Sequence, residues 1–416
     1  MSKWTKRKIR DFAFTASGGT PSTERKDYWL NGTIPWINSG ELSKHDVIKK
    51  PTTYITQEAL ENSSAKLFPV GTVVIALTGA TTGMSAILDI ETSTNQSITG
   101  IFPSKEHDSK FLLYTLQHNI DKILLHNVGS AQPHINKEIV DNLEFNYPIV
   151  AEQTKIARIL STADAVIEKT QAAIAKYKAI KQGMLQDLFT RGIDLNTGKL
   201  RPRYQDAPHL YKESKLGMIP REWDEIPLEE LTTQIGDGIH TTPKYSQNTH
   251  FYFINGNNLV NGEIQIGSAL CVSEEEFEKH FKKLDERTIM YSINGTIGNI
   301  AFYKNEQVII GKSVCYISCK PSVNLDYIYF LLQTFQVSKF YELQLTASTI
   351  RNLSLATVRG TPITIPKDER EQNLIAERIK AINTKLQTEQ TYLQKMQSLK
   401  KGLMEDLLSG KKSLNL

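Results

Sequence analysis

Apolar residues recur in alternating steps of four and three along two long stretches of the chain, one near the middle and one at the end. This spacing predicts two amphipathic helices, each with the hydrophobic seam of a coiled coil. The seam of the first stretch comprises Ile156, Leu160, Ala163, Ile167, Thr170, Ile174, Tyr177, Lys181, Met184 and Leu188. The seam of the second comprises Ile375, Ile379, Ile382, Leu386, Glu389, Leu393, Met396, Lys400, Leu403 and Leu407.

The two stretches are copies of one another. Residues 152–192 align without gaps to residues 371–411, and ten of these 41 positions are identical. The polar residues that interrupt the seam also coincide: Thr170 aligns with Glu389, and Lys181 aligns with Lys400. We interpret the pair as an internal duplication.

Each copy predicts a helix of about 38 residues, which is about 57 Å long at 1.5 Å per residue. Two helices with matching seams in one chain most simply pack on each other. The alternatives are unrelated surface helices, or helices that pair only with partner proteins. A pseudo-twofold axis relating the repeats would make the helices antiparallel, with one globular module at each end.

Two local features of these helices carry further expectations. The segment Asp368-Glu369-Arg370-Glu371 follows Pro366 and predicts a capping box at the start of the second helix. Gly183 and Gly402 occupy the same repeat position, although glycine inside a helix is unfavourable by up to about 1 kcal/mol. Either another backbone approaches closely there, or each helix frays at that point.

The segments between the helices predict two similar modules. In residues 1–147, short β-branched runs indicate strands at 34–38, 72–77, 85–90 and 97–102, followed by a helix over about 110–125. The second module repeats this layout more loosely: Trp223 lies 219 positions after Trp4. We therefore predict an α+β chain with modules at 1–147 and 223–366, helices at 148–192 and 367–416, and a connector at 193–222.

Composition narrows the class of protein. The 416 residues carry 49 Lys and Arg against 45 Asp and Glu, a net charge of +4 that permits nucleic-acid binding without requiring it. Neither a signal peptide nor an apolar run of about eighteen residues is present, so we expect a soluble, cytoplasmic protein. Cys271, Cys315 and Cys319 are too few for a disulfide framework, and we expect buried free thiols without a metal.

No catalytic motif stands out. The segment Gly311-Lys312-Ser313 resembles the end of a phosphate-binding loop, but Glu306 stands where that motif needs its first glycine. No His-Glu-x-x-His motif occurs, and neither His45, His134 nor His240 has an evident acid or nucleophile beside it. We expect a chain without catalytic residues.

The loops are rich in side chains that bind base edges and phosphates. We predict DNA contacts from these loops as groups, because any single member is more often an ordinary turn residue. The first-module candidates are Trp36, Asn38, Lys44, His45, Thr81, Thr82, Gln132, His134, Asn136 and Lys137. The second-module candidates are His240, Thr241, Thr242, Lys244, Tyr245, Asn255, Asn257, Asn258, Asn294, Thr296, Lys312, Ser348, Thr349 and Arg351.

Across nearly its whole length the chain resembles the DNA-specificity subunits of type I restriction–modification enzymes. The resemblance rests on the helix openings at Glu152-Gln153 and Glu371-Gln372, and on the endings Lys181-Gln182-Gly183-Met184 and Lys400-Lys401-Gly402-Leu403. It also rests on Leu216-Gly217-Met218-Ile219-Pro220-Arg221-Glu222-Trp223 before the second module. The first module departs from the pattern because it lacks this lead-in before Trp4.

The resemblance implies two target-recognition domains, each reading one half of a bipartite, asymmetric sequence in double-stranded DNA. It implies that the paired helices set the half-site spacing and dock two methyltransferase subunits. S-adenosylmethionine, ATP and Mg would then bind to the methyltransferase and restriction subunits and not to this chain. Base-contacting residues form no transferable motif in this family, so the candidates above rest on loop chemistry.

Two alternatives remain open. The chain could serve a related system in which methyltransferase and nuclease share one partner polypeptide. It could also be a coiled-coil adaptor whose two modules bind proteins, although its candidate faces are polar loops and not apolar patches.

Overall fold

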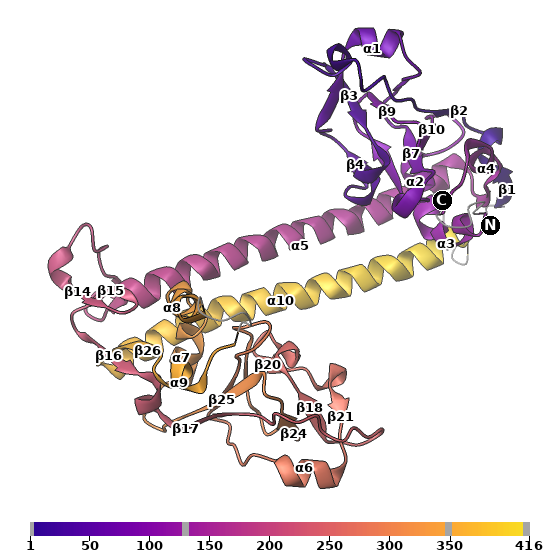
Figure 1. Cartoon of the computed structure of the whole chain (residues 1–416). Helices are drawn as coiled ribbons and strands as arrows, with labels where there is room; N and C mark the ends of the chain where they lie inside the picture. Colours follow the sequence, from indigo (N-terminus) through magenta and orange to yellow (C-terminus); the bar gives the residue numbers. More distant parts are fainter. Residues whose placement is uncertain (1–3, 127–132, 346–351, 411–416) are drawn as a thin grey trace. The chain divides into compact units, whose positions relative to one another are not determined.

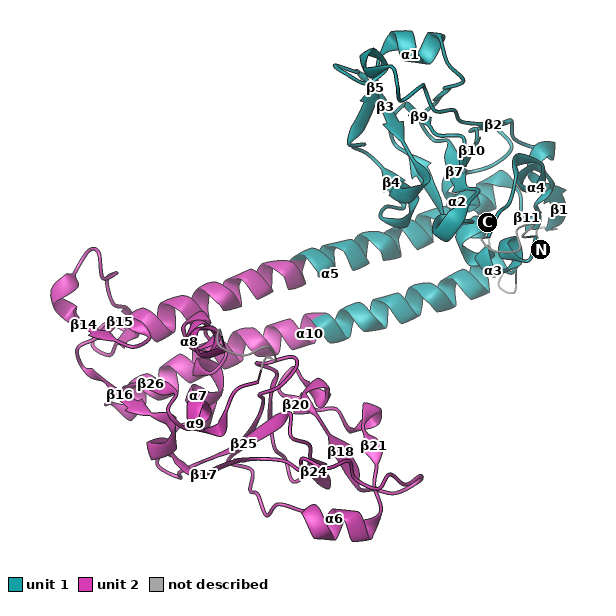
Figure 2. Cartoon of the chain, viewed as in Figure 1, with its two compact units in different colours: residues 1–172, 390–416 teal, residues 173–389 magenta. Residues whose placement is uncertain are grey.

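The computed structural model describes residues 4–126, 133–345 and 352–410 of the chain. These form two compact units, coloured separately in Figure 2. Unit 1 comprises Met1–Ala172 and Gln390–Leu416, and unit 2 comprises Ala173–Glu389. The two predicted long helices are present as α5 (Val150–Arg191) and α10 (Glu369–Leu408). The division between units crosses both helices, so each unit contains one half of each.

Unit 1 is built on a five-stranded sheet in the order β2-β10-β7-β8-β4 and a four-stranded sheet in the order β5-β3-β9-β6. Neighbours in the first sheet are antiparallel except β4 and β8, and β3 runs parallel to β9. The predicted strands are confirmed within one or two residues. The strand bounds are β1 Thr5–Lys8, β2 Thr15–Ser17, β3 Ile34–Ile37, β4 Val47–Ile48, β5 Thr53–Ile55, β6 Leu67–Phe68, β7 Val73–Ala76, β8 Ser85–Leu88, β9 Thr92–Thr94, β10 Ile98–Ile101 and β11 Glu144–Tyr147.

Helix α2 packs against β7 and β8 of the five-stranded sheet, and α4 packs against β2 of the same sheet. Asp108 caps α2 by accepting hydrogen bonds from the backbone N–H groups of Lys110 and Phe111. The single predicted helix over 110–125 is divided at Asn119, which ends α2 and begins α3. The bounds of these short helices are α1 Gln57–Glu61, α2 Ser109–His118, α3 Ile120–Leu124 and α4 Lys137–Asn142.

Strand β1 and the preceding Trp4 are held by two kinds of contact in unit 1. Strand β1 pairs antiparallel with β11, so that Thr5 lies opposite Tyr147. Trp4 packs edge-on against Phe111, with 6.3 Å between ring centroids. Backbone pairing and aromatic packing therefore hold Trp4 and β1 against the rest of unit 1.

Unit 2 repeats this topology. The sheet order β17-β25-β22-β23 corresponds to β2-β10-β7-β8, and β18 runs parallel to β24 as β3 does to β9. The pair β16-β26 corresponds to β1-β11. The strand bounds are β12 Ile193–Asp194, β13 Lys199–Leu200, β14 Tyr211–Ser214, β15 Gly217–Pro220, β16 Trp223–Pro227, β17 Thr232–Asp237, β18 Tyr252–Ile254, β19 Leu259–Val260, β20 Glu263–Ile264, β21 Leu270–Cys271, β22 Thr288–Ser292, β23 Ile300–Phe302, β24 Val308–Ile310, β25 Val314–Cys319 and β26 Pro362–Pro366.

The described residues of unit 2 also form four shorter helices, which Figure 1 labels α6, α7, α8 and α9. Asn324 caps α7 through a hydrogen bond from the Tyr327 backbone, in the place that Asp108 has in unit 1. The helix bounds are α6 Glu274–His280, α7 Leu325–Leu331, α8 Phe335–Leu345 and α9 Leu355–Arg359.

The half-helices belong to the cores of their units. In unit 1, Ile156 and Leu160 near the start of α5 share a hydrophobic cluster with Leu407 and Leu408 at the end of α10. In unit 2, the same relationship holds between the end of α5 and the start of α10. Each fully buried Ile or Leu contributes about 1.5–3 kcal/mol. Each unit thus contains two helix segments that run in opposite directions.

All twenty seam positions are buried or half-buried. The polar interruption at Lys400 is matched in unit 1 by Asp164 of α5, at 2.5 Å between Nζ and Oδ1. Its repeat counterpart Lys181 lies in unit 2, where its Nζ donates to Gln333 Oε1 at 3.4 Å. The same repeat position therefore has a charged partner in unit 1 and a neutral one in unit 2.

Within the described chain, neither expectation for the helix glycines holds. A Cβ built on Gly183 or Gly402 would have nothing within 4 Å beyond its own helix, among the residues that the structure describes. Neither helix frays there, because α5 continues to Arg191 and α10 to Leu408. The predicted capping box is half correct. Asp368 accepts from the Arg370 backbone, but the Glu371 carboxylate turns to the Ile193 N–H and Arg201 instead.

Cys315 and Cys319 are buried free thiols, as expected, whereas Cys271 is only half-buried. Burial raises the pKa of the Cys319 thiol to about 12. Over the described part of the chain, no helix is long and apolar enough to cross a membrane.

Candidate nucleic-acid interface

A polar cavity of about 510 Å³ lies at the strand ends of unit 2. Four chain segments line it: the loop after β17, the end of β18 with the turn that follows, the loop after β22, and the turn between β24 and β25. The lining residues are Ile239, His240, Thr241, Thr242, Pro243, Tyr245, Phe253, Asn255, Gly256, Asn257, Asn294, Gly295, Thr296, Gly311, Lys312 and Ser313.

Backbone hydrogen bonds hold the first and last of these segments together. The Ile239 N–H donates to the Ile310 carbonyl at 2.7 Å, and the Lys312 N–H donates to the Ile239 carbonyl at 3.0 Å. A Cβ on Gly238 would lie 1.9 Å from the Ile310 carbonyl oxygen, so only glycine permits this approach. The segments that contain His240 and Lys312 therefore line the cavity side by side.

The turn after β18 is fixed by its own polar side chains. Asn255 Oδ1 accepts from the Asn257 backbone at 2.9 Å and caps the short turn Gly256–Asn258. Ser313 Oγ accepts from the Gly256 N–H at 3.1 Å, which ties this turn to the β24–β25 turn. The cavity wall is thus rigid at its backbone while Asn257 stays exposed.

The side chains at the rim offer donors and acceptors in a mixture that suits base edges. Lys312, His240, Thr241 and Thr242 are exposed, and Asn294 is half-exposed. His240 Nε2 lies 3.0 Å from Asp237 Oδ2, so the carboxylate orients the imidazole. Asp237 was not among the predicted residues, because a single acidic residue at a strand end carries no sequence signal. Within the described ranges, no group of three or more His, Cys, Asp or Glu could hold a metal ion.

The structure brings most of the second-module candidates together. Nine of the fourteen line the cavity: His240, Thr241, Thr242, Tyr245, Asn255, Asn257, Asn294, Thr296 and Lys312. Lys244 is exposed beside it, whereas Asn258 is 4% exposed and bonds the Asn255 N–H and the Gln265 carbonyl. We therefore assign Asn258 to the turn and not to the rim. Ser348, Thr349 and Arg351 lie outside the described residues.

The first-module candidates are more dispersed. Lys44 and His45 line a different cavity, of about 960 Å³, together with Lys49, Lys50 and residues of α5 and α10. Trp36 is 8% exposed and its Nε1–H donates to the Gly19 carbonyl, so it belongs to the core. Thr82 is 5% exposed and donates to the Gly79 and Pro133 carbonyls, which also makes it structural.

Three of the remaining first-module candidates, Asn38, Asn136 and Lys137, make local contacts. Asn38 caps the turn after β3, and Asn136 caps α4 through the Ile139 N–H. Lys137 pairs with Asp141 at 2.7 Å. Thr81 and His134 are half-exposed, and His134 lies in a β-bridge with Thr78. Gln132 lies outside the described residues. Asn and Ser in loops cap turns as often as they bind ligands, and sequence does not separate these two roles.

Comparison with known proteins identifies the family that the chain matches. The family model described as type I restriction modification DNA specificity domain matches residues 1–177 and again residues 220–398. The two matches begin 219 positions apart, which is the spacing of the internal repeat.

Several curated proteins are similar to the chain. The putative type I restriction enzyme MjaX specificity subunit of Methanocaldococcus jannaschii is 24% identical over 421 residues, covering 98% of this chain and 93% of that protein. The MjaIX specificity subunit of the same organism is 28% identical over 299 residues, covering 70% of this chain and 66% of that protein.

A solved S subunit of a type I restriction–modification system from M. genitalium shares the fold. It matches with a TM-score of 0.62 at 17% sequence identity, over 100% of this chain and 97% of that one. At that identity the likeness bears on the fold alone, whereas the family model covers most of the sequence. The chain therefore belongs to the type I restriction modification DNA specificity family.

Proposed function

We propose that this chain selects the DNA sequence for a type I restriction–modification complex, each unit reading one half of a bipartite, asymmetric site. The observation that carries the proposal is a duplicated backbone with different side chains at corresponding strand ends. The sheet order repeats between units, yet the rim of unit 2 displays His240 and Lys312, which have no identical residue in unit 1. Two units with the same backbone and different side chains suit the recognition of two different half-sites.

The long helices would hold the readers a fixed distance apart as an intramolecular coiled coil. Their seam residues are withdrawn from solvent, and such a spacer makes the second reading event intramolecular, which strengthens two weak contacts without any new one. The outer faces of the helices would dock two methyltransferase subunits. Exposed positions there include Lys176, Lys395 and Gln397.

Chemistry would then reside in the partners. We propose that this chain contributes no catalytic group, that methyltransferase subunits bring S-adenosylmethionine, and that restriction subunits bring ATP and Mg. The net charge of +4 supports this division. A chain that neutralises few phosphates by itself binds DNA weakly.

The proposal is tested by mapping methylated adenines in the host with and without this chain. We expect one bipartite motif to disappear when the chain is removed and to return on complementation. In gel-shift assays, we expect the chain alone to bind cognate and scrambled duplexes alike, and the complex to prefer the cognate duplex. Methylation that persists without the chain would exclude the proposed role.

A further inference from the structure

The loops at the strand ends of the two units correspond residue by residue. In unit 1 the Asn95 N–H donates to the Ile37 carbonyl, and in unit 2 the Gly311 N–H donates to the Ile254 carbonyl, at 3.0 and 2.9 Å. The bond from Leu77 to the Ser97 carbonyl matches the bond from Ile293 to the Ser313 carbonyl. These pairs define one register between the turns.

Further contacts agree with this register. The Ile98 N–H donates to the Asn95 carbonyl, as the Val314 N–H donates to the Gly311 carbonyl. Residues 95, 97 and 98 therefore correspond to 311, 313 and 314, each 216 positions later. The position between them is fixed without ambiguity: Gln96 corresponds to Lys312.

The loop that faces this turn matches as well. The Gly19 N–H donates to the Thr94 carbonyl at 2.8 Å, as the Ile239 N–H does to the Ile310 carbonyl. A Cβ on Gly18 would lie 2.0 Å from Thr94 Oγ1, which reproduces the close approach at Gly238. Thr20 therefore corresponds to His240. In unit 1 these two loops touch, because Thr20 Oγ1 donates to Gln96 Oε1.

The rest of the rim corresponds too. Asn38 caps its turn through the Gly40 N–H at 2.8 Å, as Asn255 does through the Asn257 N–H. The bridge between Thr78 and His134 matches the bridge between Asn294 and Asn352. Gly79 and Gly295, next in the chain, both have positive φ, at 77° and 73°. Unit 1 thus possesses the framework of the unit 2 cavity, around Gln96 and Thr20.

We propose that Gln96 and Lys312 are equivalent specificity-determining residues, one in each unit, each reading one base of its own half-site. The inference rests on the proposed function. Both side chains are exposed on a turn whose backbone is fixed on both sides. Lysine donates to guanine O6 and N7, whereas glutamine bonds adenine N6 and N7. Lys312 accordingly selects guanine, and Gln96 selects adenine.

With this assignment, the proposed base-contacting surface of unit 1 excludes several residues that were predicted from loop composition. Trp36 and Thr82 are buried, and Lys137 is paired with Asp141. Gln96 escapes composition-based prediction because the β9–β10 turn is only a few residues long and sits within a β-rich run. Only the correspondence with Lys312 singles it out.

The test exchanges the two side chains in the full chain, co-expressed with the methyltransferase subunits of the proposed complex. Lys312→Gln should shift one base of one half-site from guanine to adenine. Gln96→Lys should make the reverse shift in the other half-site. Binding of the original duplex by each variant complex should fall on the order of tenfold to hundredfold. Methylated-base mapping and selection from randomised duplexes give both readouts.

Two controls make the same charge changes elsewhere, at exposed positions away from these turns. Lys283→Gln in unit 2 and Gln57→Lys in unit 1 should leave both half-sites unchanged. The inference is overturned if the exchanged variants still methylate the original bipartite motif with unchanged affinity, while the proposed function stands. If one exchange alters both half-sites, the two units do not read separate half-sites, and the proposed function is wrong as well.

Discussion

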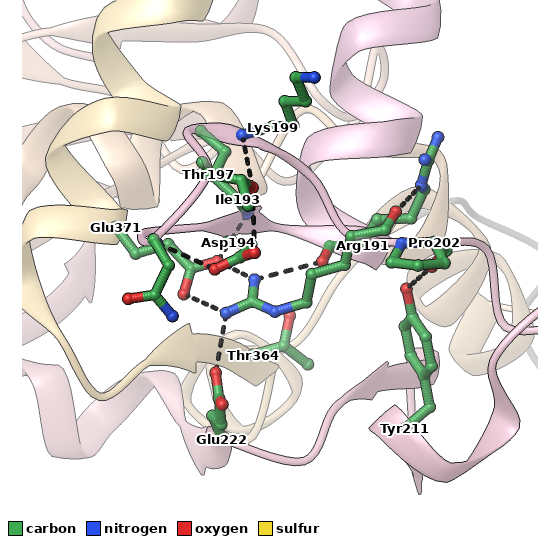
Figure 3. A network of polar contacts seen from close by, with 12 residues as sticks. Arg191, Ile193, Asp194, Thr197, Lys199, Pro202, Tyr211, Glu222, Thr364 and Glu371 are labelled. Atoms are coloured by element: carbon green, nitrogen blue, oxygen red, sulfur yellow. Dashed lines mark hydrogen bonds and ion pairs between the residues drawn. The ribbon is translucent and has the colours of Figure 1, made fainter.

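Arg201 and Glu371 form a bidentate ion pair in the interior of unit 2. Arg201 Nη1 and Nη2 donate to Glu371 Oε1 and Oε2 at 2.5 and 3.0 Å, and the two side chains are 10% and 3% exposed. Glu371 Oε1 also accepts from the Ile193 N–H at 2.8 Å (Figure 3). Arg201 donates in addition to Glu222. The pair joins the segment after α5 to the first turn of α10, where the helix dipole favours a carboxylate.

Removing one partner of this pair should destabilise unit 2 strongly. Glu371→Gln leaves the Arg201 guanidinium buried without its main counter-charge, which typically costs about 3–5 kcal/mol. Urea unfolding of the full chain, with hydrogen exchange to locate the loss in unit 2, measures this effect. Glu222→Gln is the matched control. Because Glu222 is 76% exposed, its loss should cost less than about 1 kcal/mol. Equal losses in the two variants would contradict a buried pair.

The two seam lysines should respond oppositely to replacement by methionine. Lys400 pairs with Asp164, which also accepts from the Tyr114 hydroxyl at 2.6 Å. Lys400→Met leaves that half-buried carboxylate uncompensated, so we expect a loss of about 1–2 kcal/mol. Lys181 has the Gln333 amide oxygen beside it, and Lys181→Met should raise stability at pH 7 by up to about 1 kcal/mol.

The pH dependence of folding stability further distinguishes Lys181 from Lys400. Burial lowers the pKa of Lys181 below its usual value of 10.5. Between that lowered pKa and 10.5, the unfolded chain binds more protons than the folded one, so stability rises with pH across this window. Lys181→Met should abolish this rise. Denaturation curves from pH 7 to 10.5 test it, and an unchanged slope in the variant would show that Lys181 titrates normally.

The helix glycines offer a test of both stability and assembly. Because nothing described lies within 4 Å of a Cβ on Gly183 or Gly402, alanine should stabilise each helix by about 0.5–1 kcal/mol. If methyltransferase subunits place a backbone against these positions, the same substitutions should weaken complex formation while stabilising the free chain. Thermal unfolding of the chain and co-purification of the complex give the two readouts. A destabilised free chain would contradict the open surroundings.

The sequence predicted the elements with strong periodicity and missed those that depend on a distant partner. The apolar positions that begin at Ile156 and at Ile375 recur at helical spacing. The two long helices and their duplication therefore follow from the pattern alone. The role of Glu371 did not follow, because Arg201 reaches it from 170 residues away. The candidate site divides similarly. His240 and Lys312 were predicted from loop chemistry and line the cavity, whereas Trp36 was predicted on the same grounds and is buried.

The duplication predicts that the first half of the chain can replace the second. In unit 1, the end of α10 contributes Leu407 and Leu408 to the core, and Leu188 and Phe189 hold the same repeat positions in α5. A fragment of residues 1–200 should therefore pair with a second copy of itself through α5. Lys181 of each copy would then occupy the position of Lys400, opposite Asp164 of the other copy.

This charge pairing makes the two halves unequal. In a dimer of residues 193–416, which keeps Arg201 beside Glu371, the position of Asp164 is taken by Asn383, so Lys400 would face an amide. We expect the 1–200 fragment to dimerise more tightly, and Asp164→Asn to weaken that dimer without affecting the other. With methyltransferase, the 1–200 dimer should modify a symmetric site made of two copies of one half-sequence. Sedimentation and methylated-base mapping decide this. A monomeric fragment, or one that still reads the asymmetric site, would refute the pairing of α5 and α10 as equivalent halves of one spacer.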